Sequence, residues 1–63
     1  MSYREAKELA EIRQVLRDGL SAGDVRGAWP ALERLRQVAT RDSDLRAEYE
    51  RWSFRFDLLS IAA

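Results

Sequence analysis

The sequence contains no cysteine and no histidine. The lack of cysteine excludes disulfides, and the lack of both residues excludes the usual zinc sites. Without histidine, none of the serines has the base that normally activates a hydrolase nucleophile. The three glycines, Gly19, Gly23 and Gly27, do not form a phosphate-binding pattern. We therefore expect no catalytic residue, no metal and no cofactor, and predict that the protein is not an enzyme.

The chain also lacks an excess of charge of either sign. Eleven Lys and Arg residues balance eleven Asp and Glu residues, which argues against the basic surface that non-specific nucleic-acid binding requires. No apolar run approaches the roughly 20 residues of a membrane span, and the first residues lack the apolar stretch of a signal peptide. We expect a cytoplasmic location, no membrane association, and no nucleic acid as the main partner.

What the sequence does contain is typical of a small folded helical protein. Hydrophobic residues make up 46% of the chain and charged residues 35%, which is too apolar for a disordered segment. At 63 residues, we predict a single helical domain over residues 1–63. A chain of this length buries only about 60% of its unfolded surface. We therefore expect self-association or a partner protein to complete the fold.

The first helix is predicted over about residues 2–19. Ser2 and Glu5 have the spacing of a capping box, which marks a helix start. Arg4 and Glu8 are an opposite-charge pair four residues apart on the polar side. One apolar stripe recurs at spacings of three and four: Ala6, Leu9, Ile12, Leu16 and Leu20.

The second helix is predicted over about residues 24–40, and Pro30 leaves its start open. A helix that begins at Asp24 contains the proline and would lose a hydrogen bond and bend there. A helix that begins at Trp29 or Pro30 instead has the proline at the favoured first position. The residues on either side of Pro30 are compatible with both interpretations.

The third helix, predicted over about residues 44–61, has two apolar faces. At about 100° per residue, one set forms a heptad-like seam: Leu45, Tyr49, Trp52, Phe56 and Leu59. A second set lies roughly opposite: Ala47, Phe54, Leu58 and Ile61. The predicted fold class is therefore all-α, with three helices in an antiparallel arrangement joined by short loops.

Two explanations of the second face are possible. The third helix could lie in the middle of the bundle, with one face on each of the other helices, and would then need no partner. Alternatively, one face contacts another chain, because a corner helix in a three-helix bundle normally has one continuous apolar sector. We favour the second explanation, in which aromatic residues anchor binding. The predicted partner-binding residues are Trp29, Arg51, Phe54, Arg55, Leu58 and Ile61.

The run from Asp42 to Trp52 is followed by Asp57, Leu58 and Leu59, and Asp18-Gly19 lies upstream of it. In these segments, residues 17–59 resemble the N-terminal helical domain of anti-sigma factors. Ser43 stands where that family has a proline. The resemblance implies a small helical domain that binds a sigma factor. A second resemblance, from Gly23 to Tyr49, is to a single tetratricopeptide-like hairpin, which also implies docking on another surface.

These observations lead to three functional hypotheses. The first is a non-catalytic protein–protein interaction module, a transcription regulator that binds a sigma factor or a similar protein. The second is a self-associating homodimer that uses the same helix face. The third is a DNA-binding regulator that uses the arginines at the junction of the second and third helices: Arg34, Arg36, Arg41 and Arg46. Glu48, Glu50 and Asp57 on the following helix oppose this third hypothesis.

Overall fold

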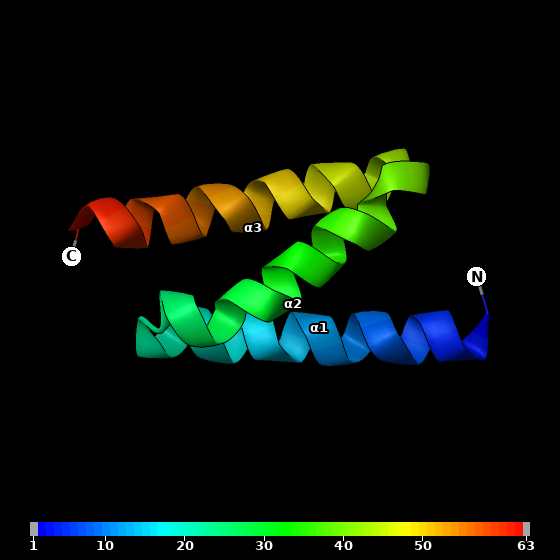
Figure 1. Cartoon of the computed structure of the whole chain (residues 1–63), viewed down its shortest axis with the longest axis horizontal. Coiled ribbons are helices and arrows are strands. Elements are labelled where there is room, and N and C mark those ends of the chain that lie inside the picture. The colour runs from blue at the N-terminus through cyan, green and yellow to red at the C-terminus, as the bar shows by residue number, and fades with distance from the viewer. Residues whose placement is uncertain (1, 63) are drawn as a thin grey trace.

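The computed structural model describes residues 2–62 and confirms the all-α, three-helix prediction. The elements are α1 (Tyr3–Ala22), α2 (Val25–Val38), a 3₁₀ turn η1 (Ala39–Arg41) and α3 (Ser43–Ala62). Figure 1 shows that α1 and α3 run in the same direction along the long axis of the molecule, and that α2 returns obliquely from the end of α1 toward the start of α3. Consecutive helices are therefore antiparallel, as expected for short connections.

Helix α1 starts where the sequence predicts and ends three residues later than predicted. Ser2 is the N-cap, and its Oγ accepts a hydrogen bond from the Glu5 amide at 3.2 Å. Gly23 ends the helix in the left-handed conformation, with φ 67°, which glycine adopts without a steric penalty. Gly19 lies inside the helix instead, where a Cβ would stand 2.7 Å from the Cβ of Ala28. It therefore allows α1 and α2 to approach closely.

Helix α2 begins before Pro30, so the alternative start at Trp29 or Pro30 is wrong. Asp24 is the N-cap, and its Oδ1 accepts from the Gly27 amide at 2.9 Å. This cap is sufficient to begin the helix upstream, and Pro30 then lies on an exposed position within α2. The α-helix also ends earlier than predicted, at Val38, and the chain continues as η1.

Helix α3 extends the predicted range by one residue at each end. Asp42 Oδ1 accepts hydrogen bonds from the amides of Asp44, at 2.9 Å, and Leu45, at 3.2 Å. The side chain thus satisfies two of the amides that a helix start leaves without partners.

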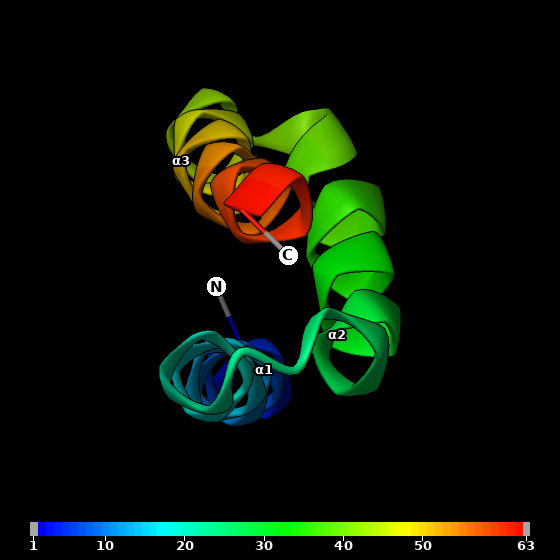
Figure 2. The same ribbon diagram turned by 90° about the vertical axis from the view of Figure 1, so that its left-hand side faces the viewer.

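The hydrophobic core lies along α2, which α1 and α3 both contact more extensively than they contact each other. Figure 2 shows α2 to one side of the other two helices, and α2 is the helix against which both of them pack. The explanation that the second face of the third helix packs within the bundle is wrong, because Phe54, Leu58 and Ile61 on that face are exposed. The buried side chains come from all three helices and η1: Leu9, Ile12, Leu16, Ala28, Leu32, Leu35, Ala39, Leu45 and Phe56.

The first apolar face of α3 is the face that packs in this core. Leu45 and Phe56 are buried, and Tyr49, Trp52 and Leu59 pack partly buried against them. Within residues 2–62, no helix is both long and apolar enough to span a bilayer. On the opposite face of α3, Phe54, Leu58 and Ile61 are exposed, and no element within residues 2–62 covers them.

Candidate functional site

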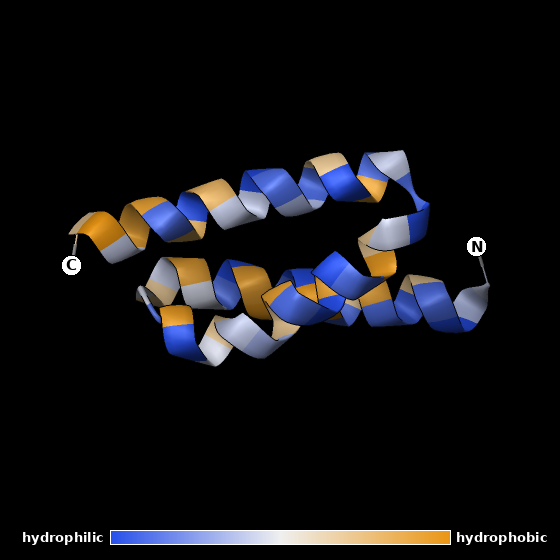
Figure 3. Ribbon diagram, turned by 45° about the horizontal axis from the view of Figure 1, so that its top comes forward, coloured by the Kyte–Doolittle hydropathy of each residue, from blue (hydrophilic) through white to orange (hydrophobic). Residues whose placement is uncertain are grey.

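The outer face of α3 exposes a row of three large apolar side chains. Phe54 is 63% exposed, Leu58 50% and Ile61 82%, and we call these three residues the α3 stripe. Ala47 lies on the same side of the helix and is exposed as well. Figure 3 shows hydrophobic residues gathered in the C-terminal half of α3. A contiguous exposed apolar patch of this kind is typical of an interaction surface.

Charges of opposite sign lie along the two edges of the α3 stripe. At about 100° per residue, Arg51 and Arg55 lie on one side of it and Glu50 and Asp57 on the other. None of the ion pairs within residues 2–62 includes any of these four side chains. The arginine edge and the acidic edge are both available to a partner.

Arg51 and Arg55 also line a groove between α1 and α3. The groove has a volume of about 250 Å³, and we call it the arginine groove; it is lined by Arg13, Arg17, Glu48, Arg51, Trp52 and Arg55. The guanidinium carbon of Arg55 lies 5.6 Å from the centre of the Trp52 ring, within the range of a cation–π contact. Four arginines and one carboxylate give this groove an excess of positive charge.

Glu48 is the point at which α3 is attached to α1. Arg13 donates to it through Nε, at 2.8 Å, and Nη2, at 2.7 Å, and Trp52 Nε1 donates at 3.2 Å. The hydrogen bond from Arg13 holds the pKa of Glu48 below its usual value, while partial burial acts in the opposite direction. This bidentate pair occupies one of the four guanidinium groups of the groove.

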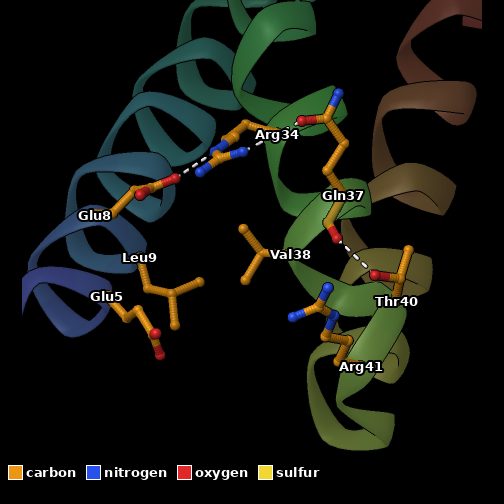
Figure 4. Close-up of a pocket in the computed structure, with 8 residues that line it drawn as sticks. All are labelled: Glu5, Glu8, Leu9, Arg34, Gln37, Val38, Thr40 and Arg41. Carbon is orange, nitrogen blue, oxygen red and sulfur yellow. Dashed lines mark hydrogen bonds and ion pairs between the residues drawn. The ribbon is translucent and has the colours of Figure 1, made fainter. Parts of the chain in front are cut away.

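A larger pocket, of about 360 Å³, lies between α1, α2 and η1 and is polar at its rim. Figure 4 shows Glu8 beside Arg34, whose guanidinium also donates to Gln37 Oε1 at 3.3 Å. The hydrogen bond from Arg34 lowers the pKa of Glu8. Glu8 and Arg34 therefore already have partners within the chain, and Glu5 and Arg41 also line the pocket.

One expectation about charged residues differs from the structure. Glu8 was expected to pair with Arg4 on α1, and it pairs with Arg34 of α2 instead. Of the arginines considered for DNA binding, Arg36 pairs with Glu33, and Arg46 donates to the Thr40 carbonyl at 3.2 Å. Three of those four side chains thus interact with their own chain.

Five of the six predicted partner-binding residues lie together on α3: Arg51, Phe54, Arg55, Leu58 and Ile61. The sixth, Trp29, is 56% exposed on α2. Sequence reasoning missed Arg13 and Arg17, which α1 contributes to the arginine groove. The only local signal for Arg13 and Arg17 is their spacing of four residues, which places them on one side of α1. Nothing in the sequence indicates that α3 lies beside this side of α1.

Within residues 2–62, no group of three or more metal-ligating side chains comes together. Comparisons of the chain with protein-family models, with curated proteins and with solved structures found no match. The assignment of function therefore depends on the surface of the chain itself, where the α3 stripe and its charged edges are the most distinctive feature.

Proposed function

We propose that this protein is a non-catalytic protein–protein interaction module that binds its partner through the α3 stripe. One observation carries the proposal: Phe54, Leu58 and Ile61 form an exposed row on a helix whose opposite face already supplies the core. Within residues 2–62, packing of the core does not explain why these three exposed side chains are apolar.

The energetic argument follows from the size of these side chains. Full burial of a Phe, Leu or Ile side chain is worth about 1.5–3 kcal/mol relative to exposure. An aromatic residue surrounded by aliphatic residues and arginines is the composition of a binding hot spot. Arg51 and Arg55 at the edge would contact carboxylates of the partner.

We further propose a sigma factor, or a protein that interacts with one, as the first foreign partner to test, with regulation of transcription as the process. The support is the resemblance of residues 17–59 to anti-sigma domains. Nucleic acid is a weaker candidate because Arg34, Arg36 and Arg46 interact within the chain. The acidic edge formed by Glu50 and Asp57 would also repel phosphate groups.

The test compares proteins that co-purify with the tagged chain from the source cells, including a second copy with a different tag. The stripe variant is Phe54→Ser with Leu58→Ser. The matched control is Tyr3→Ser with Val15→Ser, because these apolar side chains are also exposed, 85% and 43%, but lie on α1. We expect both variants to retain helical circular dichroism, and only the stripe variant to lose an associated protein.

Two results would contradict the proposal. If the stripe variant unfolds at concentrations at which the wild type is a folded monomer, and the control does not, the stripe belongs to the core of the single chain. If it folds and retains every protein that the wild type binds, α3 is not the docking surface.

A further inference from the structure

We infer that the α3 stripe pairs with the α3 stripe of a second copy of this chain, with the two helices parallel and related by a two-fold axis. This inference rests on the proposed function and names the partner. It is carried by three features of the described residues: the spacing of the stripe, the charges on its edges, and the ion pair that engages Glu48 within the chain.

The outer face of α3 has the spacing of a coiled-coil seam. Ala47, Arg51, Phe54, Leu58 and Ile61 follow one another at intervals of four, three, four and three residues. Ala47, Phe54 and Ile61 then take one seam position of the heptad, d, and Arg51 and Leu58 take the other, a. Every one of these positions is exposed in the single chain, so the whole seam is accessible to a second helix.

The edges of the seam decide the orientation of the pair. In this register Glu50 and Asp57 are at g positions and Arg55 is at an e position. In a parallel pair, a g residue faces the e residue five positions later on the other helix. Glu50 of each copy would therefore face Arg55 of the other, and the two-fold axis would repeat the contact.

An antiparallel pair would bring together charges of the same sign. A two-fold axis perpendicular to the helices places each edge against the same edge of the other copy, so Glu50 and Asp57 would face acidic residues. Arg55 would likewise face the arginine edge. Like charges in such positions are destabilising, and the parallel orientation is therefore favoured.

Glu48 is the other charged residue at an e position, and its negative charge is already paired within the chain. Arg13 of α1 holds it in a bidentate pair at 2.7 and 2.8 Å. Glu48 therefore does not compete for Arg55 of the second copy, nor does it add an unpaired negative charge to the arginine edge.

Arg51 is the one charged residue within the seam. A polar residue at a single a position of a coiled coil lowers stability but specifies the register and the number of helices. The long side chain of Arg51 can place its apolar stem in the seam and its guanidinium at the edge. There it would meet Glu50 of the second copy, which in a parallel pair flanks the same position.

Charge reversal distinguishes the parallel pair from the antiparallel one. We expect sedimentation equilibrium to show a reversible dimer of the wild type at micromolar to submillimolar concentrations. Glu50→Arg should weaken the dimer roughly tenfold, because two symmetry-related pairs become repulsive. Glu50→Arg with Arg55→Glu should restore it, since the exchanged charges again attract. In an antiparallel dimer, Glu50→Arg would instead strengthen association by removing acidic repulsion.

A cysteine introduced at the seam tests the register independently. Because the chain contains no cysteine, Ile61→Cys introduces a single thiol. In the parallel pair this thiol lies opposite the same thiol of the second copy, and the two should form an intermolecular disulfide rapidly under mild oxidation. Glu11→Cys, exposed on α1, is the control and should cross-link slowly. Equal cross-linking of the two variants would overturn the inference.

The outcomes separate this inference from the proposed function. A monomer at all concentrations that still captures a foreign protein through the α3 stripe would overturn the second-copy partner and leave the proposed function intact. If the wild type is a monomer and the stripe variant captures the same proteins as the wild type, both the inference and the proposed function are overturned. A dimer that the stripe variant abolishes and Glu50→Arg weakens supports both.

Discussion

At the scale of single residues, the contact between Arg13 and Glu48 links the helices at the two ends of the chain. The two residues are 35 positions apart, and the side chain of Glu48 is 16% exposed while that of Arg13 is 38% exposed. Partial burial strengthens such a bidentate pair relative to one in open water, and the exposure of Arg13 limits its contribution to about 1 kcal/mol.

This pair makes stability depend on pH in a defined direction. The pKa of Glu48 in the folded chain is lowered from its ordinary value of 4.5, first of all by the hydrogen bond from Arg13. The contribution of the pair to the free energy of unfolding is therefore complete when the pH is above the ordinary pKa of a glutamate, and it is lost as the pH falls through the lowered pKa of Glu48. We expect Glu48→Gln to lower the free energy of unfolding by about 1 kcal/mol at neutral pH.

Urea denaturation of the wild type and Glu48→Gln over a pH series measures this difference. The difference should shrink toward zero in strong acid, where the wild-type carboxyl is protonated. The other carboxylates that ion pairing perturbs, Glu8 and Glu33, are present in both proteins, so their titration cancels. A difference that is independent of pH would show that the role of Glu48 is not electrostatic.

At the scale of single elements, Pro30 is the residue least suited to its position. It lies within α2, has no amide hydrogen to donate to the carbonyl of Arg26 four residues earlier, and is exposed to solvent. The N-cap at Asp24 and the buried residues on either side of the proline hold the helix in place. Tertiary packing here overrides a local preference against helix.

Replacing Pro30 by alanine should therefore stabilise the protein. The substitution restores a backbone donor and the better helix propensity of alanine, and Pro30 is exposed, so no core contact is removed. We expect the free energy of unfolding to rise by about 1 kcal/mol or more, measured by denaturant titration. Ala22→Gly at the exposed end of α1 is a suitable control and should lower stability, by up to about 1 kcal/mol.

At the scale of the whole molecule, a chain with extents of 38 × 19 × 14 Å has only a thin core. Leu16 and Leu35 are its largest fully buried side chains. Such a molecule gains a large share of its stability from any surface that it buries on association. The α3 stripe contains three of the six large apolar side chains that residues 2–62 expose.

Association through the stripe should make thermal stability depend on protein concentration. We expect the melting temperature of the wild type to rise with concentration, because dilution favours the less stable monomer. The Phe54→Ser, Leu58→Ser variant should melt at a temperature that does not change with concentration. Circular dichroism melts over a hundredfold range of concentration measure this; a constant wild-type melting temperature would contradict association through the stripe.

The sequence by itself determined the elements and most of the candidate site. A periodicity of three to four residues predicted all three helices, and the capping box at Ser2 and Glu5 placed the start of the first. The start of the second helix stayed open between Asp24 and Pro30 until the structure showed the N-cap at Asp24. The same periodicity separated the two faces of α3, so Phe54, Leu58 and Ile61 were predicted together. These features are local, because helix geometry relates residues only a few positions apart.

Only the tertiary structure decided which helix the other two pack against, which face of α3 is covered, and which charges meet. Gly19 and Ala28 set the close approach of α1 and α2, and α3 packs mainly on α2 while it also contacts α1. Arg13 and Glu48 meet as a consequence. The physical reason is that helix periodicity states which residues share a face, whereas the neighbour of each face depends on how three helices bury their apolar sides at once.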